Sequence, residues 1–236
     1  MTVRFDDVAI TWLGYATAKI ETADGPTVYT DPGRYGVLDG YDERDGDLVI
    51  VTHDHHYDPD GIDRVADEDA TVVLYESIDA SAIDRDVTPV DELEYDTRRV
   101  GEESHLSIET GSGRIDLWSV PAYNEPDGPC ANADGTVPHP RGSGCGYLVS
   151  VDGRRIFWPG DADALPGYAA LDVSVFLANI GGTVVSDASA SAALTARMRP
   201  DLVVPIHYDT IETLAADAPG FAADVAGRGI PVALDE

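Results

Sequence analysis

Positive charge is what this sequence has least of. Its 236 residues include a single lysine, Lys19, and 15 basic residues in all against 44 acidic ones, so the formal net charge is −29. A chain this negative repels nucleic acids and anionic membrane surfaces. We therefore expect no nucleic acid and no membrane as a partner.

The excess of acidic residues has a pattern of its own. Aspartate far outnumbers glutamate, and the acidic residues are spread over the whole length instead of forming a tail. This composition resembles that of proteins from salt-loving archaea, in which molar salt screens the repulsion between like charges. We interpret the charge as an adaptation to a halophilic solvent and not as a property of the substrate.

Cysteines and long apolar runs are also scarce. Cys130 and Cys145 are the only cysteines, and an isolated pair does not make a disulfide framework, so reduced thiols in a cytosolic protein are the simpler interpretation. No apolar run approaches the length that spans a bilayer, and the first residues lack the apolar core of a signal peptide. We expect a cytoplasmic protein and leave open whether it forms a homo-oligomer.

A cluster of histidines and aspartates stands at the end of an apolar, β-branched run. Residues 47–51 are followed by His53, His55 and His56, half of the six histidines in the chain. Imidazole and carboxylate groups are the ligands that Zn²⁺, Mn²⁺ and Fe²⁺ accept. His53 and His55 point to the same side if the backbone is extended, and a turn can bring His56 or Asp58 to the same point. This pattern predicts a divalent metal site.

Other predicted strands also end in potential ligands. A strand over residues 155–158 runs into Asp161, and a strand over 201–206 delivers His207. The carboxyl ends of strands in α/β sheets meet where ligands bind. A lone aspartate there is most often a helix cap and a lone histidine a core residue, so the convergence of three strand ends favours one shared site. Asp31 ends an earlier strand, as a turn residue or as a carboxylate behind a ligand histidine.

The hydrophobic pattern predicts an α/β chain. Strands are expected over residues 8–13, 18–22, 27–30, 71–75, 114–120, 146–151, 173–178 and 230–234, and helices over 59–66, 77–83, 188–198 and 211–226. No linker divides the chain, so we predict a single domain over residues 1–236.

A long segment, residues 121–146, is rich in glycine, proline and asparagine and has no periodicity. Loops of this length in compact domains are usually functional or mobile. The segment contains His139 and Arg141 in a basic tetrapeptide. They are either a surface histidine and a salt-bridged arginine or members of the site, and we favour roles in the site.

Several motifs, in their order, resemble the metallo-β-lactamase fold superfamily and, within it, the branch of lactonase-like and phosphodiesterase-like hydrolases. The resemblance covers nearly the whole chain. The motifs are Gly14-Tyr15-Ala16, Asp31-Pro32, Thr52-His53-Asp54-His55, Pro121-Ala122-Tyr123-Asn124, His139-Pro140-Arg141-Gly142, Gly160-Asp161-Ala162-Asp163, Ile180-Gly181-Gly182-Thr183 and Pro205-Ile206-His207-Tyr208.

The resemblance implies an αββα four-layer sandwich, two mixed β-sheets flanked by helices with the metals at one edge. It also implies that Asp161 bridges two ions, that His53 and His55 bind the first, and that His207 binds the second. A metal-activated water would then attack an ester, lactone or phosphodiester. Zn²⁺ is the expected cofactor, with Mn²⁺ as the alternative.

The chain departs from the family pattern at two places. The family signature continues with Asp-His, whereas Tyr57 and Asp58 stand here, and a two-residue deletion would remove the aspartate and move the last histidine to His56. Whether the site binds one ion or two therefore stays open. Asn124 stands where many relatives have a histidine ligand, and His139 is expected to replace that ligand from the loop.

Two hypotheses follow. The first is a metal-dependent hydrolase in which Asp161 or Asp58 orients the attacking water. Its metal ligands are drawn from His53, His55, His56, His139, Asp161 and His207, and its substrate is held by Arg141, Asn124 and the backbone amides of Gly181 and Gly182. The second is a catalytically degenerate metal-binding protein that kept the fold and lost the second metal site.

Overall fold

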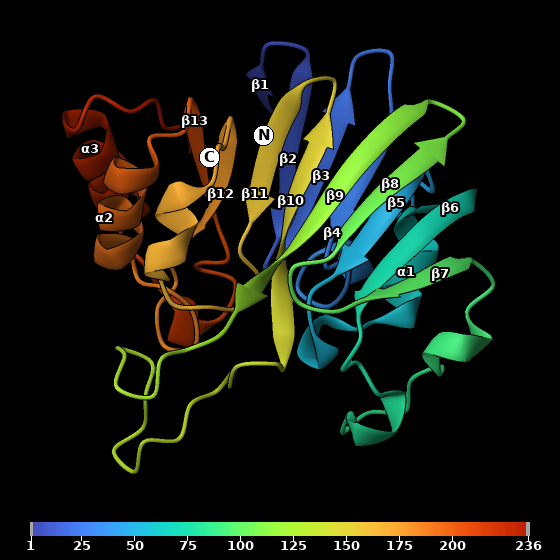
Figure 1. Ribbon diagram of the computed structural model, residues 1–236, viewed down its shortest axis with the longest axis horizontal. Helices are drawn as coiled ribbons and strands as arrows, with labels where there is room; N and C mark the ends of the chain where they lie inside the picture. The colour runs from blue at the N-terminus through green and yellow to red at the C-terminus, as the bar shows by residue number, and fades with distance from the viewer. Residues whose placement is uncertain (1, 235–236) are drawn as a thin grey trace.

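The computed structural model describes residues 2–234, which form two mixed β-sheets packed face to face (Figure 1). Strands β1 to β4 of the first sheet are antiparallel neighbours and β4 to β7 are parallel neighbours. In spatial order the sheet contains β1 (Thr2–Phe5), β2 (Val8–Gly14), β3 (Thr17–Thr22), β4 (Thr27–Thr30), β5 (Gly46–Val51), β6 (Ala66–Tyr75) and β7 (Asp96–Val100).

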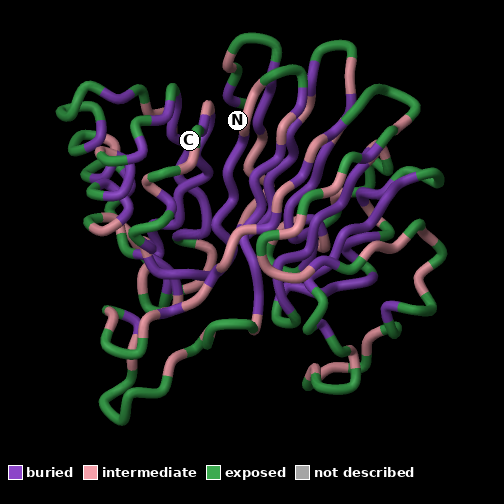
Figure 2. Tube along the Cα trace, in the orientation of Figure 1, coloured by how far each residue is buried: buried purple, intermediate pink, exposed green. Residues whose placement is uncertain are grey.

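The second sheet is antiparallel from β8 to β11 and parallel from β11 to β13. Its strands follow the chain order from one edge to the other. They are β8 (His105–Thr110), β9 (Gly113–Ala122), β10 (Gly144–Val151), β11 (Arg154–Trp158), β12 (Val175–Asn179) and β13 (Leu202–Ile206). The long loop between β9 and β10 extends beyond the sheets and is largely exposed (Figure 2).

Helices cover the outer faces of the two sheets. α1 (Pro59–Val65) connects β5 to β6, while α2 (Ala188–Met198) and α3 (Ala218–Gly227) lie beside β12 and β13 (Figure 1). Short 3₁₀ turns complete the connections: η1 (Val37–Asp39), η2 (Asp54–His56), η3 (Ala80–Ala82), η4 (Val90–Glu92), η5 (Pro166–Ala170) and η6 (Glu212–Leu214). Within residues 2–234, no helix has the length and apolar character needed to cross a bilayer.

Alternate side chains of β11 and β12 build two separate cores. Ile156 and Val175 belong to the cluster between the sheets, whereas Phe157 and Phe176 belong to the cluster under α2 and α3. Successive side chains of a strand point to opposite faces, so strands covered on both sides are apolar throughout. This arrangement of helix, sheet, sheet and helix confirms the predicted four-layer αββα sandwich.

Three predicted elements were wrong in extent. Residues 211–226 do not form one helix, because Asp217 caps a new helix and Pro219 occupies its first turn, where the missing proline amide does no harm. Residues 230–234 contribute one bridge, from Val232 to Val203, and not a strand; Pro231 cannot donate to a ladder there. The helix expected over 77–83 is reduced to the turn η3.

Candidate metal centre

Asp161 lies between four histidines that come from both sheets. Its Oδ1 is 3.8 Å from His56 Nε2 and 3.4 Å from His207 Nε2. Its Oδ2 is 3.8 Å from His53 Nε2 and 3.5 Å from His139 Nε2. The described residues therefore form two groups of three potential ligands that share one carboxylate: His53, His139 and Asp161, and His56, Asp161 and His207.

The potential ligand atoms are buried and mostly unpartnered. His53 Nε2, His56 Nε2, His207 Nε2 and both Asp161 oxygens find no hydrogen-bond partner among the described residues. Buried polar atoms without partners are rare because each one has lost its contact with water. A divalent cation in each group would satisfy all five atoms at once, so the side chains present fit a pair of metal ions.

Local backbone turns aim these side chains at one point. The turn η2 follows His53 directly and swings His56 back, so that the two ring centroids lie 4.4 Å apart. Gly160 precedes Asp161 with φ +64°, and a Cβ there would lie 2.7 Å from the Cys145 carbonyl oxygen, which only glycine avoids. His207 itself has φ +61°, a strained conformation of the kind that concentrates at functional sites.

Asp31 holds His56 from behind. Its carboxylate accepts hydrogen bonds from Trp158 Nε1 at 2.7 Å and from the Thr52 amide at 2.8 Å. The same carboxylate lies 3.3 Å from His56 Nδ1. Such a contact fixes the orientation of an imidazole and leaves Nε2 free to face an ion. Of the two roles left open for Asp31, this contact favours the carboxylate behind a candidate ligand histidine.

Three of the candidate ligands, His53, His207 and Asp161, have protonation states that suit metal binding. Burial lowers the pKa of His207 to about 4, although Asp161 acts in the opposite direction, and burial also brings the pKa of His53 well below its ordinary value. Burial alone would raise the pKa of Asp161, but the surrounding histidines hold it well below its usual range. Burial would lower the pKa of His56, yet Asp161 and Asp31 raise it. Neutral imidazoles and an ionised carboxylate are the forms that bind metals.

The structure does not bring His55 or Asp58 into either ligand group. His55 is exposed, and its ring lies 6.1 Å from that of His53. Asp58 caps α1, since its Oδ1 accepts a hydrogen bond from the Gly61 amide at 3.3 Å, and its Oδ2 pairs with Arg85 at 3.3 Å. Both oxygens of Asp58 therefore already have partners.

Asn124, Gly181 and Gly182, which were assigned to substrate binding from the sequence, make contacts with the backbone instead. The Oδ1 of Asn124 accepts a hydrogen bond from the His139 amide at 3.0 Å and lies 3.2 Å from His139 Nδ1. Through these two contacts the buried Asn124 holds the potential ligand His139 in place. The Gly182 amide donates to the Ser186 carbonyl and Gly181 bridges to Asp187, so the Gly182 amide is engaged within a turn.

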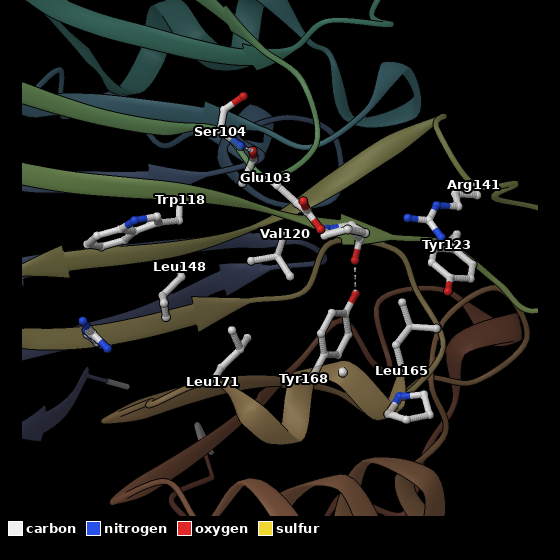
Figure 3. A pocket seen from close by; sticks show the side chains of 15 residues that line it. Glu103, Ser104, Trp118, Val120, Tyr123, Arg141, Leu148, Leu165, Tyr168 and Leu171 are labelled. Atoms are coloured by element: carbon white, nitrogen blue, oxygen red, sulfur yellow. Dashed lines mark hydrogen bonds between the residues drawn. The ribbon is translucent and has the colours of Figure 1, made fainter.

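Arg141 points into a groove of about 570 Å³ on the outer face of the second sheet (Figure 3). None of the residues that line this groove belongs to the two ligand groups. The Arg141 guanidinium lies 5.4 Å from the centre of the Tyr123 ring and pairs with Glu102 at 3.3 Å. Arg141 therefore has an acidic partner of its own.

A small recess beside the candidate metal centre contains Arg34 and Tyr35, which the sequence did not point to. Tyr15, His55 and His56 also line it. The Tyr15 ring lies 4.4 Å from that of His207 and 5.2 Å from that of His56. Two motifs offered a signal, because Tyr15 stands inside the Gly-Tyr-Ala motif and Arg34 follows the Asp-Pro motif by two residues.

The fold and the paired ligand groups define a metallo-β-lactamase-fold protein with a candidate two-metal centre. A family model described as a beta-lactamase superfamily domain matches residues 9–207. The chain belongs to this family.

Relatives of similar length carry a common name. A UPF0173 metal-dependent hydrolase from Methanopyrus kandleri is 27% identical over 231 residues, 94% of each chain. One from Thermococcus kodakarensis is 26% identical over 239 residues, 96% of each.

Among solved structures, the metallo hydrolase Igni18 from Ignicoccus hospitalis has a TM-score of 0.67 at 20% identity, covering 97% of this chain and 95% of that one. An isothiocyanate hydrolase from Delia radicum gut bacteria has a TM-score of 0.66 at 14% identity, covering 96% of each. These structures share the fold.

Proposed function

We propose that this chain is a metal-dependent hydrolase with a two-metal centre bridged by Asp161. One ion would be held by His53, His139 and Asp161, and the other by His56, Asp161 and His207. The observation that carries the proposal is that the two oxygens of one buried carboxylate face different pairs of imidazoles, with no other partner for either oxygen. The names of the full-length relatives agree with it.

The chemistry of the ligands favours Zn²⁺, with Mn²⁺ as the alternative. Each group offers two imidazoles and one carboxylate oxygen, which leaves a position open for water or substrate. A divalent ion there lowers the pKa of water towards neutrality and polarises a carbonyl or phosphoryl oxygen. Asp31 and Asn124 serve as positioning residues, because they fix the rings of His56 and His139.

The substrate that we propose is a small-molecule ester, lactone or phosphodiester, as in the lactonase-like and phosphodiesterase-like branch. The protein acts in the cytoplasm of a halophilic cell. A degenerate protein with one metal site is less well supported, because His56 completes the second group although the family's aspartate is missing.

The two-metal proposal is tested by measuring the metal content per chain. Elemental analysis is carried out on protein purified at high salt without a chelator. We expect two ions in the wild type. Replacing His56 by Ala removes a ligand of the second group only, so we expect one ion and a fall in hydrolysis of at least about 100-fold. His55→Ala is the matched control from the same turn and should keep two ions. Asp161→Ala should reduce both the metal content and the rate of hydrolysis.

The opposite pattern, loss of an ion in His55→Ala and none in His56→Ala, would return the ligand role to His55. A wild type that holds one ion or none after reconstitution with Zn²⁺ or Mn²⁺ would contradict the two-metal proposal. Full metal content with no hydrolysis of any ester, lactone or phosphodiester would keep the centre and reject the substrate class.

A further inference from the structure

The recess beside His56 holds a cation with no acidic partner. Arg34 is exposed and, within residues 2–234, forms no ion pair and no hydrogen bond; its guanidinium lies 6.0 Å from the centre of the Tyr35 ring. Several other arginines are paired, such as Arg85 with Asp58, Arg141 with Glu102 and Arg154 with Asp6. Within residues 2–234, Arg4, Arg197 and Arg199 also lack an ion pair, but Arg34 differs from them in its position, because it lines the same recess as His56.

The loop that carries Arg34 is held firmly on both sides. Asp31 and Tyr35 have φ of +38° and +61°, values that persist only when the surroundings enforce them. A Cβ on Gly61 would collide with the Pro32 carbonyl, and a Cβ on Gly14 would collide with the Tyr35 carbonyl. Arg34 therefore projects from a fixed backbone next to the metal centre, as a recognition residue requires.

The acidic groups close to Arg34 are already engaged. Asp58 lines the same recess, but Arg85 pairs with it at 3.3 Å. Asp31 is buried and accepts its hydrogen bonds from Thr52 and Trp158. Arg34 lines the recess together with Tyr15 and His56, next to the candidate centre. Within residues 2–234 its positive charge has no acidic partner.

We propose that Arg34 is a specificity-determining residue that binds a carboxylate or phosphate group carried by the substrate, so that the substrate class is an anionic ester. This inference rests on the proposed hydrolase function. A guanidinium presents paired donors that match the geometry of an oxyanion. A protein with a net charge of −29 repels an anionic substrate at long range, so a local cation beside the reacting bond is needed to hold it.

Kinetics with two esters of similar length test this role. Mono(4-nitrophenyl) succinate carries a carboxylate and 4-nitrophenyl butyrate carries none. At one fixed KCl concentration, Arg34→Met should raise KM for the anionic ester roughly tenfold, the loss expected for one charge-assisted hydrogen bond, and leave the neutral ester within about twofold. Arg34→Lys should lie between Arg34→Met and the wild type. Arg44→Met is the matched control, because Arg44 is also exposed but pairs with Asp42 at 2.9 Å.

Direct binding separates this inference from the hydrolase proposal. Monomethyl succinate and methyl phosphate are titrated by calorimetry into metal-loaded wild type and Arg34→Met, with metal content measured on the same samples. We expect about tenfold weaker binding of at least one probe in the variant at unchanged metal content, and the probe affected distinguishes carboxylate from phosphate.

Equal affinity of both probes for the two proteins, or no binding of either probe to the wild type, would overturn the role of Arg34. If the wild type hydrolyses neither ester, the substrate range of the hydrolase proposal fails, while the calorimetry still decides whether Arg34 binds the anion.

Discussion

His207 shows at the scale of one residue how burial prepares a ligand. Its side chain is completely buried at the end of β13, and burial lowers its pKa to about 4. In the unfolded chain the same imidazole titrates near its ordinary value of about 6.5. Between these two pH values the unfolded chain takes up a proton that the folded chain refuses, so stability falls as the pH falls.

We therefore predict an acid-sensitive metal-free protein. Its free energy of unfolding should decline as the pH is lowered from 6.5 to 4, and His207 should account for a part on the order of 3 kcal/mol. The measurement is urea unfolding at several pH values in the presence of a chelator, for the wild type and for His207→Asn. The variant should show a shallower decline. Parallel curves for the two proteins would mean that His207 is protonated equally in both states.

The choice between His55 and His56 shows what the sequence could predict at this scale. Asp161 and His207 were predicted because each follows a strand and therefore lies at the sheet edge. The alternation of an extended strand puts His53 and His55 on one side. The backbone leaves that conformation directly after His53, however, and the turn η2 moves His56 into the place expected for His55. That turn depends on tertiary contacts, such as the one between His56 and Asp31, which no local pattern reveals.

At the scale of elements, α1 depends on Asp58. The sequence placed this residue in the site, whereas the structure shows it as the N-cap of α1 and the partner of Arg85. Replacing Asp58 by Ala should lower the free energy of unfolding by about 1–2 kcal/mol, because the Gly61 amide loses its acceptor. Metal content should stay at the wild-type number. Urea unfolding and elemental analysis on the same samples check both expectations.

Asp58→Asn is the control for this helix. It keeps an oxygen for the cap and removes the charge that pairs with Arg85, so its loss of stability should be smaller than that of Asp58→Ala. A loss of metal in either variant would restore Asp58 as a ligand.

Most elements followed from the hydrophobic pattern, and the failures have separate causes. α2 spans the residues expected for it, 188–198, because an alanine-rich run begins just after the cap residue Asp187. The helix predicted over 211–226 overlooked Pro219 as a marker of a new helix start. The recess residue Arg34 was missed because an exposed arginine in a loop has no periodic signal, and only its neighbours in space give it meaning.

At the scale of the whole molecule, the net charge of −29 opposes compaction. Screening shortens the reach of a charge from about 10 Å at 0.1 M salt to about 3 Å at 1 M. We therefore predict that thermal unfolding in 2 M KCl occurs at a higher temperature than in 0.1 M KCl, by about 2–4 °C for each kcal/mol gained. Thermal melts followed by circular dichroism measure the unfolding temperature at the two KCl concentrations. A midpoint that stays constant or falls with added KCl would contradict the interpretation of a halophilic protein.

The candidate ligands come from both sheets, with His53 and His56 after β5 and Asp161 and His207 after β11 and β13. Neither sheet alone can assemble a complete group, so high-affinity capture of an ion has to wait until the two sheets have docked. The rate of metal uptake during refolding would therefore report when the two sheets come together. Ions held by residues of both sheets would also oppose the separation of the sheets, so we expect bound metal to slow unfolding.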